Sequence, residues 1–143
     1  MSDTTTTLTD ALTVQRRMFA AVGRGDMQAL RELLHPDYRY TASDGVEHPG
    51  PQAAIDVAER YVTAFPDLRI EELRSWSPSP EVAVMEVRYR GTHTGPLGDA
   101  PPTGRAVTGL GCNIAEVRDG RLWREHEFFD QLPMLEQLGL AGD

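Results

Sequence analysis

The stretch that most constrains the fold is a pair of strand-like runs joined by Arg118-Asp119-Gly120-Arg121. An Asp-Gly pair between two such runs predicts a tight β-hairpin, because the reversal needs positive φ at its centre. With Asp119 and Gly120 as the loop, Arg118 pairs with Arg121. Residues 107–117 and 122–130 are therefore expected to be antiparallel neighbours, and counting outward places Asn113 opposite His126.

One face of this hairpin is expected to form the wall of a pocket. Side chains alternate across a strand, so residues paired in this register share a face. The incoming strand puts small side chains there, namely Gly109, Gly111 and Ala115. The returning strand puts larger or polar ones there, namely Arg124, His126, Phe128 and Asp130. The opposite face, which would carry Glu125 and Glu127, is expected to be a packing, solvent or dimer surface.

Helical patterns come early in the chain and strand patterns late. Apolar residues at helical spacing predict three N-terminal helices, over about 10–22, 26–34 and 51–64, and a short closing helix or turn over 132–138. Thr9 or Asp10 can cap the first helix. Strands are expected over 38–41, 68–76 and 81–93 and in the hairpin, with residues 43–50 as a polar loop and 77–80 as a turn. This order favours an α+β fold in which helices pack on a curved, mostly antiparallel sheet around a pocket. We expect one domain over residues 1–143, with a flexible tail at 1–8.

The composition argues against several classes of function. The formal net charge of −8 disfavours a nucleic-acid-binding or anionic-membrane surface, since both need basic patches. Cys112 is the single cysteine, so no disulfide can form within the chain. Neither a signal peptide nor a membrane-spanning stretch is recognisable, and a cytoplasmic protein is expected. The four histidines lack metal-ligand spacing, and no phosphate-binding or dinucleotide fingerprint occurs, so we expect no metal and no cofactor.

Several short motifs resemble one known family. They are Ala64-Phe-Pro-Asp67, Arg90-Gly-Thr-His-Thr-Gly95, Pro101-Pro-Thr-Gly-Arg105, Val117-Arg-Asp-Gly120, Arg124-Glu-His126, Phe129-Asp130 and Gln137-Leu-Gly-Leu140. Together they resemble the SnoaL-like polyketide cyclase branch of the nuclear-transport-factor-2-like superfamily. The resemblance implies a cone-shaped α+β barrel, a homodimer, and cofactor-independent aldol cyclisation or a related hydroxylation.

The resemblance also suggests where the chemistry would take place. In the cyclases an acidic residue on the last strand acts as general acid and base, helped by a histidine on the preceding strand. Here His126 stands at or next to the acidic position, and Asn113 or Cys112 stands at the helper's. His126 is the expected proton-transfer group because imidazole titrates near neutral pH. The alternative is a structural histidine bonded to Asn113.

Other residues complete the expected site. Asp130 is a second catalytic candidate, with a helix-capping role as the alternative. Tyr89 and His93 could donate hydrogen bonds to an enolate oxygen. The remaining expected substrate contacts are Tyr40, Phe65, Arg124 and Phe128.

Three functions follow as hypotheses. The first is a polyketide cyclase acting on a small apolar or aromatic carbonyl compound by general acid/base catalysis. The second is a cofactor-free hydroxylase of the same branch, in which a deprotonated quinone substrate reacts with oxygen. The third is a non-catalytic dimeric module that binds a small ligand.

Overall fold

The structure is a computed structural model that describes residues 10–142. The expected tail at 1–8 and the alternative cap Thr9 lie outside the described residues. Within residues 10–142 four helices are present, in the places where the sequence predicts them. They are α2 (Ala11–Gly23), α3 (Met27–Leu33), α4 (Pro51–Ala64) and α5 (Gln131–Leu138).

The helix starts follow from local side-chain chemistry. The Asp10 carboxylate accepts a hydrogen bond from the backbone N–H of Thr13 at 2.9 Å and so caps α2. Asp26 caps α3 in the same way. Pro51 occupies the first turn of α4, where no intrahelical N–H is needed.

In the described part of the chain, six strands form one open sheet in the order β2-β1-β6-β5-β4-β3. Neighbouring strands are antiparallel except β1 and β6, which are parallel. The strands are β1 (Leu34–Thr41), β2 (Glu47–Pro49), β3 (Arg69–Ser79), β4 (Val82–Thr92), β5 (Ala106–Arg118) and β6 (Arg121–Phe129). The expectation of a polar loop at 43–50 is wrong in part, because β2 pairs there with β1. The turn expected at 77–80 is wrong in part too, since β3 continues to Ser79.

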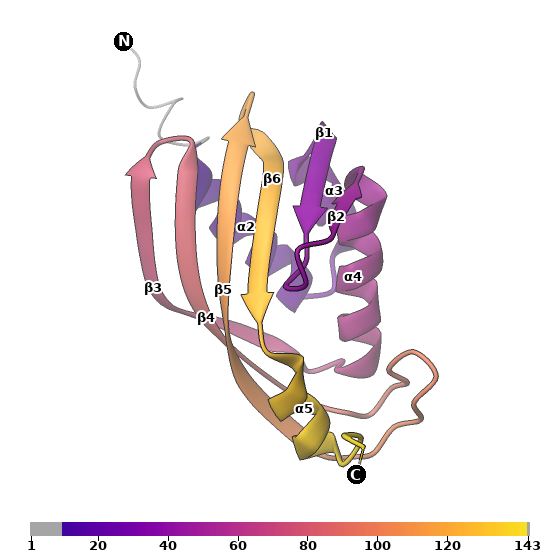
Figure 1. Cartoon of the computed structure of the whole chain (residues 1–143). Helices are drawn as coiled ribbons and strands as arrows, with labels where there is room; N and C mark the ends of the chain where they lie inside the picture. The colour runs from indigo at the N-terminus through magenta and orange to yellow at the C-terminus, as the bar shows by residue number, and fades with distance from the viewer. Residues whose placement is uncertain (1–9, 143) are drawn as a thin grey trace.

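The sheet has a face turned toward the helices, called the inner face below, and an outer face. In Figure 1 the viewer looks at the outer face, with α2 and α3 behind the sheet, α4 beside β1 and β2, and α5 beyond the end of β6. The main apolar core lies between α2, α3, α4 and the inner face, and includes Met18, Leu30, Tyr38, Ile55 and Leu122. A second cluster joins α5 to Phe65 and Val107. The α+β architecture expected from the sequence is confirmed.

Candidate active site

The turn between β5 and β6 has the predicted geometry. Arg118 pairs with Arg121, and the two loop residues Asp119 and Gly120 have φ values of 54° and 73°. Positive φ at both central positions matches the right-handed twist of the flanking strands, and an Asp-Gly pair tolerates it. The hairpin prediction is confirmed at this turn.

Just beyond the turn, one residue of β6 has no partner on β5. Val117 pairs with Leu122, but Glu116 pairs with Arg124, so Trp123 is an extra residue in a β-bulge. The indole ring of Trp123 packs against the guanidinium group of Arg124, 4.2 Å from the ring centroid. A one-residue shift of this kind reverses the face of every later side chain.

The predicted position of His126 is therefore wrong. His126 pairs with Ile114, and Asn113 pairs with Glu127. The imidazole of His126 lies on the outer face, stacked on the ring of Phe128 with 3.9 Å between centroids. His126, Phe128 and Arg124 do not line the cavity described next. The expectation that these three side chains face a pocket is overturned by the bulge.

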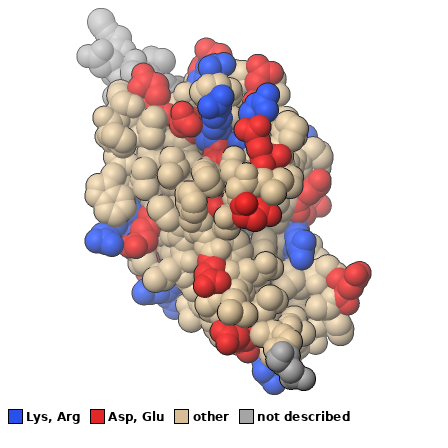
Figure 2. Space-filling view, in the orientation of Figure 1, with Lys and Arg blue, Asp and Glu red and all other residues tan. Residues whose placement is uncertain are grey.

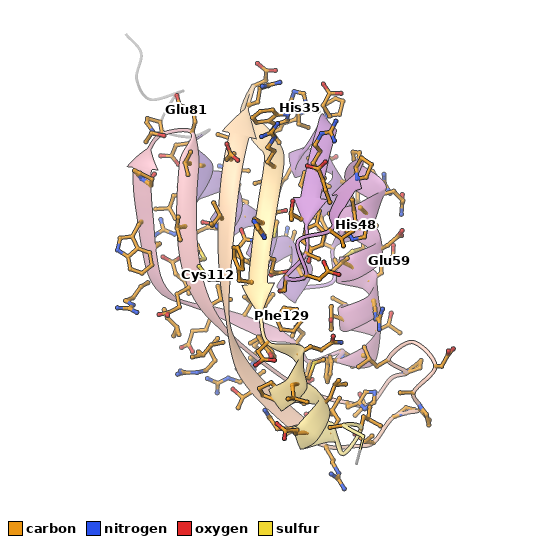
Figure 3. The ribbon with its side chains drawn as sticks, in the orientation of Figure 1. His35, His48, Glu59, Glu81, Cys112 and Phe129 are labelled. Carbon is orange, nitrogen blue, oxygen red and sulfur yellow. The ribbon has the colours of Figure 1, made fainter. Side chains whose placement is uncertain are left out.

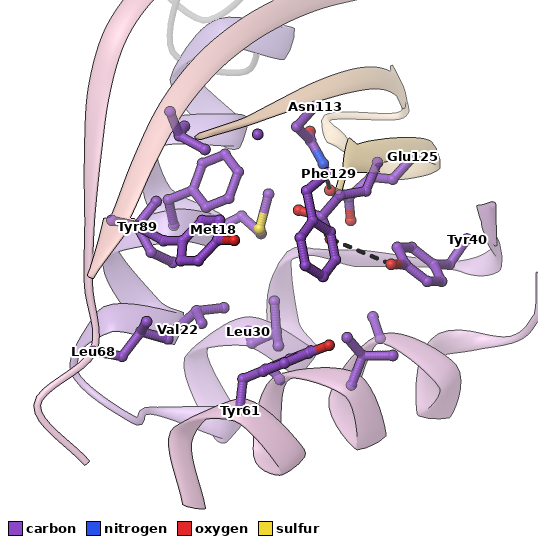
Figure 4. Close-up of a pocket in the computed structure, with 18 of the residues that line it drawn as sticks. Met18, Val22, Leu30, Tyr40, Tyr61, Leu68, Tyr89, Asn113, Glu125 and Phe129 are labelled. Carbon is purple, nitrogen blue, oxygen red and sulfur yellow. Dashed lines mark hydrogen bonds between the residues drawn. The ribbon is translucent and has the colours of Figure 1, made fainter. Parts of the chain in front are cut away.

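A cavity of about 140 Å³ lies between the inner face and helices α2, α3 and α4 (Figure 4). Most of its wall is aliphatic or aromatic, and the aromatic part includes all four tyrosines of the chain. The aromatic lining residues are Phe19, Tyr38, Tyr40, Tyr61, Phe65, Tyr89 and Phe129. The other polar lining residues are Asn113, Glu125 and Glu127, and within residues 10–142 no cationic side chain lines the cavity.

Glu127 is the titratable group best placed for chemistry in this cavity. The Tyr40 hydroxyl donates a hydrogen bond to its Oε1 at 3.2 Å, drawn as a dashed line in Figure 4. Burial and the neighbouring Glu125 carboxyl raise the pKa of Glu127 from 4.5 to about 7, and the bond from Tyr40 opposes that rise. A carboxyl group with a pKa near neutrality can both take and return a proton at physiological pH.

Glu125 lies two residues earlier on the same face and is only 6% exposed. The Tyr38 hydroxyl donates to its Oε1 at 2.6 Å, and the Asn113 amide donates to its Oε2 at 3.0 Å. Gln15 on α2 donates in turn to the Asn113 side-chain oxygen at 2.9 Å. Burial raises the pKa of Glu125, whereas its two hydrogen bonds lower it.

Tyr61 and Tyr89 bring two further hydroxyls to the cavity. Both rings pack edge-on against Phe129, with centroids 6.2 and 5.8 Å away. The hydrogen bonds within residues 10–142 leave both hydroxyls without a protein partner. Burial raises the pKa of each phenol, so both stay protonated and can donate. Tyr89 lies across Gly109, where a Cβ atom would overlap the phenol ring and its oxygen.

The remaining predicted site residues divide between the cavity wall and other places. Tyr40, Phe65, Tyr89 and Asn113 line the cavity, and their roles toward a substrate stay predictions. Asp130 caps α5 by accepting from the Leu132 N–H at 3.0 Å, which is the alternative that its position allowed.

His93 does not line the cavity either. It is fully buried, and its Nδ1 accepts a hydrogen bond from the backbone N–H of Thr103 at 3.2 Å. Its ring packs 5.5 Å from the ring of Phe65. These contacts tie His93 to Thr103 and to Phe65 and keep it away from the cavity.

The pattern of the sequence alone missed Glu125 and Glu127. One signal pointed to them, since the resembling cyclases carry their acidic residue on the last strand and Glu127 adjoins His126. A sequence pattern places a charged residue on a solvated face, because charged side chains are seldom buried without a partner. The hydrogen-bond partners of Glu125 and Glu127 lie on β1 and β5, so the local pattern of β6 does not reveal them.

No metal-ligand cluster or membrane-spanning helix is found in the part of the chain that the structure describes. Within residues 10–142, no three His, Cys, Asp or Glu side chains are grouped so that they could hold a metal ion. The helices in the same range lack the length and apolarity needed to cross a membrane. Cys112, labelled in Figure 3, is a free thiol on the outer face of β5.

Comparison with known proteins agrees with this architecture. A match to the family described as SnoaL-like polyketide cyclase spans residues 12–138. Nogalonic acid methyl ester cyclase of Streptomyces nogalater is 31% identical over 125 residues, covering 85% of this chain and 92% of that protein. Aklanonic acid methyl ester cyclase AcmA of Streptomyces galilaeus is 26% identical over 134 residues, covering 92% of each.

Solved structures show the same fold. AclR from Streptomyces galilaeus superposes with a TM-score of 0.82 at 22% identity, over 92% of this chain and 82% of that one. IdmH from Streptomyces antibioticus superposes with a TM-score of 0.76 at 26% identity, over 88% of this chain and 96% of that one. From its sequence match and its fold, the chain belongs to the SnoaL-like polyketide cyclase family.

Proposed function

We propose that the protein is a polyketide cyclase that closes a ring by an intramolecular aldol-type reaction, with Glu127 as general base and acid. The observation that carries this proposal is a carboxyl group with a pKa of about 7 on the wall of an apolar, aromatic cavity. Such a group can remove a proton from a carbon next to a carbonyl without the help of a strong external base.

The reaction needs only proton movement and one new bond. Glu127 takes a proton from carbon, and the resulting enolate carbon attacks a second carbonyl carbon of the same molecule. The alkoxide formed takes a proton, so the product is an isomer of the substrate and no electrons are gained or lost. A cofactor is therefore not required by the chemistry.

Two further features of the cavity support this step. The free hydroxyls of Tyr61 and Tyr89 can donate to the enolate oxygen as its charge develops, where preorganised donors act most strongly in a dry site. The aromatic wall suits a flat, folded polyketide, and holding its two ends together lowers the entropic cost of ring closure.

The curated relatives favour cyclisation over hydroxylation. Their names specify methyl esters of nogalonic and aklanonic acid, and both are named as cyclases. We infer that the substrate is an aromatic polyketide of this general kind. Binding without catalysis is the competing hypothesis. The experiment below separates the cyclase, the hydroxylase and the non-catalytic binding module.

The test is turnover of aklanonic and nogalonic acid methyl esters by purified protein, followed by chromatography and mass spectrometry. Glu127→Gln should lower the rate at least about 100-fold, the usual contribution of a general base. The matched control is Glu116→Gln, on the outer face opposite Arg124, which should keep wild-type activity. Full activity in Glu127→Gln would overturn the proposed role of Glu127. Oxygen uptake during turnover would indicate the hydroxylase, and binding without turnover the non-catalytic module.

We also propose that the protein is a homodimer joined through the outer face of the sheet. Three large apolar side chains on this face are exposed, Trp76 on β3, Leu110 on β5 and Phe128 on β6. Figure 2 shows a broad uncharged area on this face, with some acidic groups within it. Charged side chains of the same face include Arg88 opposite Leu110 and the Arg74–Glu86 ion pair. A second copy of the same face would cover these side chains.

A further inference from the structure

Glu125 is a second carboxyl group that the proposed reaction does not use. It lies on the same face of β6 as Glu127, since residues two apart on a strand share a face. At 6% exposure it is also more deeply buried than most carboxylates in proteins. A buried acidic side chain of this kind needs a physical explanation.

The hydrogen bonds of Glu125 indicate that it is ionised. Both of its oxygens accept, one from Tyr38 at 2.6 Å and one from Asn113 at 3.0 Å. The shorter distance is typical of a hydroxyl donating to a charged carboxylate. Tyr38 remains a donor because burial raises its pKa well above the ordinary value.

The donor set is itself held in place. Asn113 presents its amide nitrogen to Glu125 because its side-chain oxygen accepts from Gln15 at 2.9 Å. Gln15 also donates to the Asn113 backbone oxygen at 3.0 Å and is fully buried on α2. The orientation of the amide is therefore determined by a chain of contacts that begins on a different element.

Glu127 receives much weaker support for a negative charge. Within residues 10–142, the one hydrogen bond to its carboxylate comes from Tyr40 and is 3.2 Å long. The Glu127 charge also raises the pKa of Tyr38, Tyr61 and Tyr89, and these neutral phenols place no positive charge beside it. Arg60, which lowers the pKa of Tyr61, is not a lining residue.

We propose that Glu125 is a positioning residue, a fixed buried anion held by Tyr38 and Asn113, whose charge keeps the exchangeable proton of the pair on Glu127. The catalytic part of this inference rests on the proposed function. The electrostatic effect of Glu125 on Glu127 is present without substrate and can be measured in ligand-free protein. Two carboxyls that share a site do not both ionise easily, and the better-solvated or better-bonded one ionises first.

The size of the effect follows from the spacing on the strand. Residues two apart are about 6.6 Å apart along it, and at an effective dielectric constant of about 20 a unit charge at that range shifts a titration by roughly one to two pH units. Removing the charge of Glu125 should move the Glu127 midpoint down by that amount.

The direct test is a ¹³C NMR titration of the Glu127 carboxyl in ligand-free protein, with the resonance assigned by its loss in Glu127→Gln. In Glu125→Gln the midpoint should fall by roughly one to two pH units. The Tyr38 hydroxyl can turn to accept from the new amide, so this variant keeps its hydrogen bonds. In Glu125→Asp, which keeps the charge, the midpoint should stay close to the wild-type value. An unchanged midpoint in Glu125→Gln would overturn the proposal.

Two further measurements complete the test. If Glu125→Gln fails to fold, the Tyr38→Phe variant takes its place, because it removes one hydrogen-bond donor from Glu125. In that variant the titration midpoint of Glu127 should fall and that of Glu125 should rise. A Glu127 midpoint that does not fall would overturn the proposal. In the pH–rate profile the acid limb of Glu125→Gln should move to lower pH with the NMR midpoint. A shifted Glu127 midpoint in a protein that turns over no polyketide ester would support the Glu125 inference and refute the proposed function. Turnover together with an unshifted midpoint would support the proposed function and refute the Glu125 inference.

Discussion

Replacing Glu127 with glutamine should make the protein more stable at alkaline pH while it removes catalysis. The folded protein holds the pKa of this carboxyl at about 7, against an ordinary value of 4.5. A raised pKa means that folding favours the protonated form. The stability contributed by that preference is complete below pH 4.5 and is lost as the pH rises through 7.

The magnitude follows from the two pKa values. At pH 8 the wild-type protein should have lost about 3.5 kcal/mol of unfolding free energy on account of this ionisation, from 2.5 pH units at about 1.4 kcal/mol each. At pH 5.5 the loss should be only about 1.5 kcal/mol. Glutamine is neutral at both pH values and can still accept the hydrogen bond from Tyr40. The stabilisation in Glu127→Gln should therefore roughly double between pH 5.5 and pH 8.

The assay is urea unfolding followed by circular dichroism at the two pH values, with Glu116→Gln as the matched control. The control carboxyl lies on the outer face, so its replacement should change stability by about 0.5 kcal/mol or less at either pH. A stabilisation that is equal at the two pH values, or a loss of stability at pH 8, would refute the assignment of a raised pKa to Glu127.

Three further outcomes are expected. Gly109→Ala should displace the Tyr89 ring, because the added Cβ would overlap it, and should cost about 1–3 kcal/mol of stability in chemical denaturation together with at least a tenfold loss of turnover. His126→Ala should keep turnover within about twofold of wild type in the cyclase assay, because the ring lies on the outer face; a large loss would contradict that placement. Phe128→Asp combined with Leu110→Asp should convert the proposed dimer to a monomer in light scattering, and a wild-type protein that is already monomeric would exclude that interface.

Features encoded within a few residues could be predicted from the sequence. Asp10 and Asp26 cap their helices through bonds to an N–H three residues on, and Pro51 begins α4 as expected. The Asp119-Gly120 turn likewise depends only on its own backbone conformation. The order of helices and strands then follows, and with it the α+β class.

The candidate site could not be predicted in the same way. Trp123 occupies a bulge, and nothing in the alternation of β6 shows where one residue is to be skipped. Glu125 and Glu127 are buried against tyrosines of β1, more than eighty residues away in the chain. The parallel pairing of β1 with β6 that brings those tyrosines near is a tertiary contact without a local signal.

The single-residue bulge at Trp123 also determines the chemistry of the cavity. If β5 and β6 paired residue for residue without the bulge, the cavity would receive Arg124, His126 and Phe128 in place of the two glutamates and Phe129. A cationic, imidazole-bearing chamber would then replace an acidic one on an otherwise unchanged scaffold. Whether a single residue of β6 is left unpaired thus selects between two different chemistries in the same fold.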